Sequence, residues 1–248
     1  MLRWKPAIRF FEHRSELLRA FEDAGTLTAF RWRDQALGLR LGPHREIEVR
    51  PDGLRIETKS PDLRCVDAGS ALSLIFESIV PEQVVFSALS VRSLIAVDGA
   101  SSAVAAASGR KLAQGLDSEA TAVDWAMLLD GTSGSLRAAF QVEYGIVSAE
   151  EASTRLSGVR RGRIAALGDE YGPEGPGSLA LDLGNIPSTA LFADWRWSLE
   201  HVLAGRDLSA AVVGLWGRVL DESEHLTAEL QRGLGIAVVA DEGMEAQG

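Results

Sequence analysis

The chain has 248 residues, of which 46 % are apolar and 24 % are charged, and its formal net charge is −10. This composition is typical of a globular protein and excludes a disordered chain. The negative charge opposes generic nucleic-acid binding, which relies on a positive field. The single cysteine, Cys65, excludes an internal disulfide and indicates a reduced thiol. The longest apolar runs are about five residues, whereas a membrane-spanning helix needs about 20. With no apolar leader at the N-terminus, these features predict a cytoplasmic protein without a membrane span.

The first quarter of the chain predicts one helix followed by short strands. Residues 15–25 begin with a candidate N-cap serine and end with a glycine that can terminate a helix. Short runs separated by turn residues then predict an antiparallel meander, at 26–32, 36–41, 46–50 and 54–59. The clearest hairpin turn is Pro51-Asp52-Gly53, flanked by period-2 alternation.

The remaining three quarters mix strands with helices. Alternating side chains predict a half-buried strand at 135–147, and further strands are predicted at 83–97, 159–166 and 178–183. Helices are predicted at 67–79, 100–112, 117–129, 188–203 and 208–231, with Asp207 as the N-cap of the last.

This order lacks regular βαβ alternation, so it predicts an α+β fold. We expect antiparallel sheet with helices packed on one side, including the two C-terminal helices. Residues 1–240 are expected to form a single α+β domain, with 60–66 as a candidate subdivision, followed by a flexible tail at 241–248.

The motifs of nucleophilic and metal chemistry are incomplete. The segment 131–135 lacks the final glycine of a Gly-x-Ser-x-Gly elbow, and Ser108-Gly-Arg-Lys111 lacks the companion motifs of the Ser-x-x-Lys enzymes. The four histidines form no His-x-x-x-His pair, and Glu222-Ser-Glu-His225 is a single Glu-x-x-His, whereas a di-iron site needs two. We therefore predict no catalytic residue, no metal site and no cofactor, and favour a protein that is not an enzyme.

Four arginines form a basic cluster in this acidic chain: Arg155, Arg160, Arg161 and Arg163. One interpretation is contact with an anion or a nucleic acid. The other is a strand whose arginines pair with nearby acids such as Asp169 and Glu170. The second is favoured, because no aromatic residues are interleaved with the arginines.

An aromatic residue marks the candidate interaction surface. In the helix predicted at 188–203, six apolar residues form one stripe: Leu191, Phe192, Trp195, Leu199, Val202 and Leu203. Trp197 and His201 lie away from this stripe, with Asp194 beside them. An exposed tryptophan suggests contact with another chain or a ligand. The alternative is that another element covers Trp197, or that both faces of the helix are buried.

The order of elements from residue 54 onwards resembles an uncharacterised, sporadically distributed bacterial family of comparable length. The segments that carry the resemblance are Leu54–Lys59, Asp67–Ile79, Val91–Ile95, Leu179–Leu183 and Trp195–Leu230. The family's strand typically continues from its first arginine with Gly, Arg, Tyr and Asn, whereas this chain has Ser-Leu-Ile-Ala after Arg92. The resemblance implies no activity.

Three functional hypotheses follow. The first is a non-catalytic protein that binds other protein chains or self-assembles into a homo-oligomer, as an accessory or regulatory subunit. The second is a small-ligand-binding protein or enzyme with a pocket between the sheet and the C-terminal helices. Its candidate polar groups are placed on strands, and they are Arg92, Arg137, Glu143 and Asp182. The third is a nucleic-acid contact through the arginine cluster.

Overall fold

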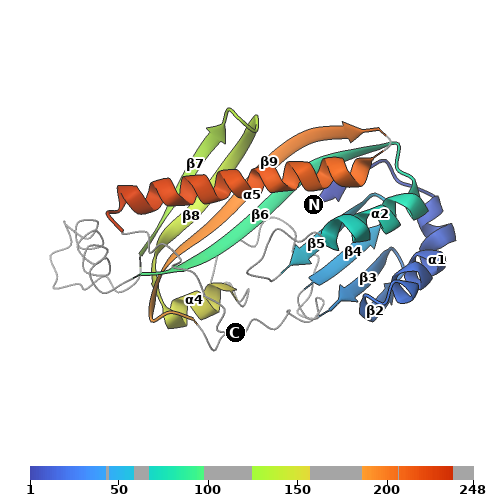
Figure 1. Cartoon of the computed structure of the whole chain (residues 1–248), viewed down its shortest axis with the longest axis horizontal. Helices are drawn as coiled ribbons and strands as arrows, with labels where there is room; N and C mark the ends of the chain where they lie inside the picture. Colours follow the sequence, from blue (N-terminus) through green and yellow to red (C-terminus); the bar gives the residue numbers. More distant parts are fainter. Residues whose placement is uncertain (43–44, 59–66, 98–124, 157–185, 206, 237–248) are drawn as a thin grey trace, which may run out of the picture.

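The computed structural model describes residues 1–42, 45–58, 67–97, 125–156, 186–205 and 207–236. Within them, one antiparallel sheet has nine strands in the order β2-β3-β4-β5-β1-β6-β9-β8-β7 (Figure 1). The helices and this sheet confirm the predicted α+β class. The candidate subdivision at 60–66 and the tail at 241–248 lie outside the described residues, as do the elements predicted at 100–112, 159–166 and 178–183.

The strands are β1 (Leu2–Arg3), β2 (Leu27–Arg33), β3 (Ala36–Leu41), β4 (Arg45–Arg50), β5 (Gly53–Thr58), β6 (Gln83–Ala96), β7 (Trp125–Ser133), β8 (Ala138–Ser148) and β9 (Thr189–Ala204). The helices are α1 (Arg9–Asp23), α2 (Asp67–Ile79), α4 (Ala149–Leu156) and α5 (Leu208–Gly233).

The two halves of the sheet have related topologies. In the first half, β1 precedes the meander β2 to β5, pairs with its last strand, and is followed after the meander by α2. In the second half, β6 precedes β7, β8 and β9, pairs with β9, and is followed by α5. The strands β1 and β6 pair antiparallel with each other and join the halves. The sheet is therefore continuous across both halves.

Three helices cover one face of the sheet. Leu17 and Phe21 of α1, Leu72 and Ile75 of α2, and Val219 of α5 belong to the same buried cluster as the strands. Figure 1 shows α5 running across β6, β8 and β9, with α2 and α1 beyond its N-terminal end. The short helix α4 lies on the other face, because its Ala152 packs on Ala190 and Phe192, which point away from α5.

Helix α5 begins as predicted. The Asp207 carboxylate accepts a hydrogen bond from the backbone N–H of Ala210 at 3.0 Å, and the Ser209 hydroxyl donates to the same oxygen at 3.0 Å. These two bonds lower the pKa of the Asp207 carboxyl, because they stabilise its charged form. A second contact fixes this end: the Ser73 hydroxyl of α2 donates to the Ser209 hydroxyl at 2.9 Å.

Two predicted helices are wrong. The segment 188–203 forms β9 instead of a helix, and residues 125–129, predicted as the end of a helix, belong to β7. Of the two helices predicted near the C-terminus, 208–231 is confirmed as α5, and the last two helices of the described chain are α4 and α5. In β9 the polar residues Asp194, Arg196, Ser198 and Glu200 alternate with buried ones, which is a strand period.

We predict that replacing Trp197 with Ala lowers the free energy of unfolding by about 3–5 kcal/mol, because it empties a large core site. Trp197 is 1 % exposed, whereas Trp32 is 42 % exposed. The matched variant Trp32→Ala should cost less, about 1–2 kcal/mol, because it removes a side chain that is only partly buried. Urea denaturation of both variants measures the difference, and equal losses would contradict the burial described here.

Candidate functional site

Trp197 belongs to the core and not to an exposed surface. Its indole N–H donates to the Ser223 hydroxyl of α5 at 2.8 Å, and Trp195 donates in the same way to Thr227 at 2.9 Å. The Phe140 ring packs against both indoles, with centroid distances of 5.1 Å to Trp197 and 5.3 Å to Trp195. The prediction that Trp197 is exposed is therefore wrong, and the alternative reading, that another element covers it, is the one observed.

Asp194 lies on the opposite face of the sheet from Trp197, as the alternation along β9 requires. Its Oδ2 accepts from Arg196 at 2.9 Å and lies 3.6 Å from Arg92 Nε. In the strand register Arg92, Asp194 and Glu143 stand directly opposite one another. The sequence predicts Arg92 and Glu143 for a pocket and Asp194 for an interaction surface. The structure places all three in one row of charged side chains across β6, β9 and β8, which we call the charged row. Because this row faces away from α5, the predicted lining of a pocket beneath α5 by Arg92 and Glu143 is wrong.

Arg155 extends the charged row from α4. Its guanidinium forms ion pairs with Glu143 and with Glu151, the latter at 2.8 Å, and lies 5.1 Å from the centre of the Phe192 ring. Burial acts to lower the pKa of Arg155, but the hydrogen bonds and charges of the two glutamates raise it above the ordinary value. Pairing with local acids is thus observed for Arg155. Arg160, Arg161, Arg163 and Asp182 lie outside the described residues.

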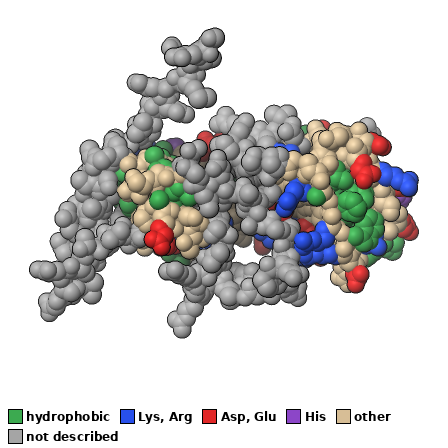
Figure 2. Space-filling view, turned by 90° about the horizontal axis from the view of Figure 1, so that it is seen from below, with side chains coloured by type: hydrophobic (Ala, Val, Ile, Leu, Met, Phe, Trp, Pro, Cys, Tyr) green, Lys and Arg blue, Asp and Glu red, His purple; other side chains and the backbone are tan. Residues whose placement is uncertain are grey.

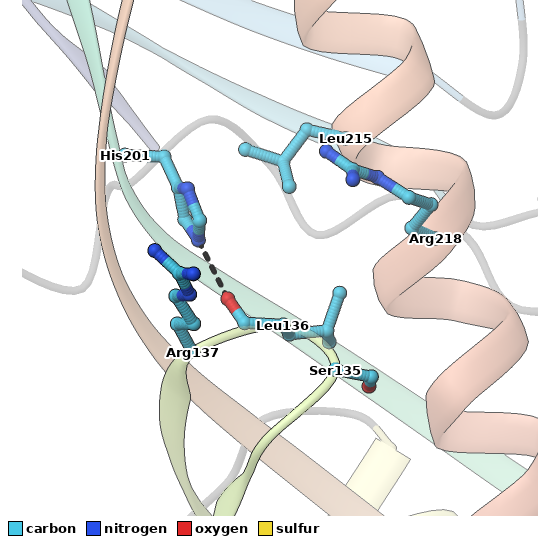
Figure 3. Close-up of a pocket in the computed structure, with 6 residues that line it drawn as sticks. All are labelled: Ser135, Leu136, Arg137, His201, Leu215 and Arg218. Carbon is cyan, nitrogen blue, oxygen red and sulfur yellow. Dashed lines mark hydrogen bonds between the residues drawn. The ribbon is translucent and has the colours of Figure 1, made fainter.

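A pocket of about 240 Å³ lies between the sheet and α5. Its lining residues are Ser135, Leu136 and Arg137 from the β7–β8 turn, His201 from β9, and Leu215 and Arg218 from α5 (Figure 3). This pocket lies on the side of the sheet that faces α5. Of the four pocket candidates only Arg137 lines it, and His201, predicted for an interaction surface, joins it there.

The β7–β8 turn holds Arg137 in an unusual backbone conformation. Arg137 follows β7 and precedes β8, so it lies in the turn and not on a strand as predicted, and its φ is +49°. Left-handed φ is uncommon outside glycine. The turn is fixed by the buried Leu136, whose N–H donates to the Ser133 hydroxyl at 3.3 Å and whose carbonyl accepts from His201 Nε2 at 2.8 Å.

The edge strand β2 exposes an apolar surface that the sequence reading did not single out. Across the helix-covered face, Trp32 stands opposite Leu37 and Phe30 opposite Leu39. Leu37 is fully buried and Leu39 is 2 % exposed, whereas Phe30 is 53 % and Trp32 42 % exposed. The apolar rows of the core therefore run one strand beyond the cover that the described helices provide.

One arginine connects β2 to α1. The Arg14 guanidinium lies 4.6 Å from the Trp32 ring centre and 5.9 Å from that of Phe11, which is itself exposed. Arg14 also donates to the backbone carbonyls of Arg33 and Asp34 at 3.3 and 3.2 Å. We call Phe11, Arg14, Phe30 and Trp32 the β2 patch. Figure 2 shows hydrophobic side chains gathered at the end of the molecule that carries α1 and β2.

Other site types are not found in the described part of the chain. No group of three or more His, Cys, Asp or Glu side chains there could hold a metal ion. No helix there is long and apolar enough to cross a membrane. Searches of protein-family models, of curated proteins and of solved structures find no match to this chain. The functional argument therefore depends on the β2 patch, the charged row and the pocket.

We predict that replacing Asp194 with Ala lowers the free energy of unfolding by about 1–3 kcal/mol, because two arginines lose their buried acceptor. The variant Arg92→Met should cost less, since Arg196 still pairs with the Asp194 carboxylate and lies closer to it. Chemical denaturation of both variants provides the comparison. A larger loss for Arg92→Met would show that the row is not organised around Asp194.

Proposed function

We propose that this protein acts by binding an extended segment of another protein chain, which adds as a strand to the free edge of β2. The observation that carries the proposal is the exposure of Phe30 and Trp32 at the end of two otherwise buried apolar rows. Exposed aromatic residues next to a sheet edge are typical of protein-binding surfaces. Protein binding is also the function that the sequence suggested. The proposed surface is now the β2 patch instead of the region around Trp197.

The backbone of β2 supports strand addition. β2 pairs with β3 on one side, and no described strand pairs with its other side. A free edge presents unpaired N–H and C=O groups that an incoming strand can use. β2 contains neither proline nor glycine in its seven residues, and after a register shift between Leu27 and Ala29 its pairing is regular from Ala29 to Arg33, so this part can continue such a ladder.

The side chains of β2 indicate which segment fits. Phe30 and Trp32 point to the helix-covered face, while Arg31 and Arg33 point to the other face. A segment in which apolar and acidic residues alternate would place its apolar side chains beside the aromatics and its acids beside the arginines.

A second copy of this chain fits less well. Antiparallel pairing of β2 with another β2 would bring the arginines of both copies together on one face, and like charges across strands are destabilising. The region around β2 is also the basic part of the protein. Residues 1–64 carry 13 basic and 10 acidic side chains, whereas residues 65–248 carry 12 basic and 25 acidic ones.

The test uses a fluorescent peptide as long as β2 in which valine and glutamate alternate, with binding followed by fluorescence polarisation. We predict that Trp32→Ser weakens binding by about tenfold or more, because an aromatic anchor is lost from the contact. Val202→Ser is the matched control, since Val202 is an exposed apolar residue on a different strand, at 61 % against 42 % for Trp32. That variant should bind as the wild type does.

Two modified peptides separate strand addition from simple hydrophobic adsorption. N-methylation of the residues whose N–H groups face β2 should abolish binding, whereas methylation of the intervening residues should leave it intact, because hydrogen bonds face β2 at alternate residues only. A peptide with lysine in place of glutamate should bind weakly. Equal binding of all the peptides would overturn the proposal, as would a wild-type dimer that dissociates in Trp32→Ser.

A further inference from the structure

The pocket between the β7–β8 turn and α5 brings together two arginines and a histidine from three separate elements. Arg137 comes from the turn, His201 from β9 and Arg218 from α5. Figure 3 shows the Arg137 guanidinium beside the His201 ring and the Arg218 side chain extending along Leu215 on the α5 side. None of the six lining residues is acidic. The charged groups of the lining are therefore the two arginines, in a chain of net charge −10.

The two arginines of the pocket differ from several arginines elsewhere in the described structure. Six that form ion pairs with carboxylates are Arg40, Arg50, Arg55, Arg92, Arg155 and Arg196. Among the described residues, the guanidinium groups of Arg137 and Arg218, both exposed, make no hydrogen bond and no ion pair. Their donors are thus available to an anion, and a guanidinium can give two parallel hydrogen bonds to one oxyanion.

The chain positions Arg137 at a cost in backbone energy. A non-glycine residue at φ +49° is strained, and such strain persists where the surroundings fix the conformation. Here the turn is fixed by Leu136, through its buried side chain and its bonds to Ser133 and His201. Glycine would adopt this conformation more easily. The backbone alone therefore favours glycine at position 137, and we ascribe the arginine found there to its guanidinium.

The size of the pocket and its apolar wall restrict the ligand. A volume of about 240 Å³ corresponds to roughly eight water molecules and lies below the range of drug-sized ligand sites. Leu136 and Leu215 form an apolar part of the lining, and the Ser135 hydroxyl, which donates its hydrogen to Ser133, adds a polar group. The pocket therefore suits a compact molecule that has an oxyanion at one end and a small apolar group at the other.

We propose that this pocket binds a small phosphate monoester, with its phosphoryl oxygens held by Arg137 and Arg218 and its organic part against Leu136 and Leu215. His201 is oriented for this site, because its Nε2–H donates to the Leu136 carbonyl and leaves Nδ1 as the remaining polar atom of the ring. The site is independent of the proposed function, since β2 is at one edge of the sheet and the pocket lies beyond β6.

The experiment is calorimetric titration of the full chain at low ionic strength with inorganic phosphate, phenyl phosphate and benzoate. Phenyl phosphate should bind most tightly, because inorganic phosphate lacks the apolar part and benzoate offers the two arginines only two oxygens and one negative charge, against three oxygens and nearly two charges. Arg137→Gly and Arg218→Gln should each weaken its binding by about tenfold or more, as expected for loss of a charge-assisted contact. Arg137→Gly also relieves the strained backbone, so its unfolding midpoint should not fall.

The control variant is Arg9→Gln, which removes the same charge from an exposed position on α1. It should bind phenyl phosphate as the wild type does, and Arg137→Gly should still bind the alternating peptide. The proposal is overturned if phenyl phosphate does not bind, if benzoate or inorganic phosphate binds equally well, or if Arg9→Gln weakens binding as much as the pocket variants do.

Discussion

The docking of α5 onto β9 organises the second half of the sheet. Two indole N–H groups donate to two hydroxyls, from Trp195 to Thr227 and from Trp197 to Ser223. Neighbouring same-face residues on a strand are about 6.8 Å apart, and residues four apart on a helix are about 6 Å apart, so the two pairs match in spacing. Each hydroxyl also donates to the carbonyl four residues earlier in α5. These buried polar groups are thus satisfied, and they fix the helix in one register.

The sequence predicts the α+β class, the meander and α5, because turn residues and caps act locally. It fails at β9, where two periodicities coexist. The residues Leu191, Trp195, Leu199 and Val202 have a helical spacing, yet Asp194, Arg196, Ser198 and Glu200 alternate strictly with apolar side chains. What decides between them is pairing with β6 and β8 on both sides. Such long-range pairing leaves no local signal beyond the alternation itself.

For the candidate sites, the sequence predicts several of the residues but not which of them come into contact. His201 and Arg137 are both singled out by the sequence, but their meeting depends on the β7–β8 turn folding back against β9. Arg92, Asp194 and Glu143 become neighbours only through the register of three strands. The β2 patch is missed for a different reason. Strand alternation predicts that Phe30 and Trp32 share a face, but not that the helices stop short of it.

The short strand β1 has a mechanical consequence for the whole sheet. Its two residues pair with both β5 and β6, and at this seam a Cβ on Gly53 would come within 2.4 Å of the Leu2 carbonyl oxygen, so the backbones approach closely there. Beside β1, Met1 adds hydrogen bonds with Ser87 and Ala88, and Trp4 adds bonds to Pro51 and Asp52. Elsewhere the strands are joined by longer ladders, such as that between β6 and β9. The junction between the two halves of the sheet therefore depends on the first four residues of the chain and on the packing of α2 against α5. The two halves of the nine-stranded sheet are thus joined through its shortest strand.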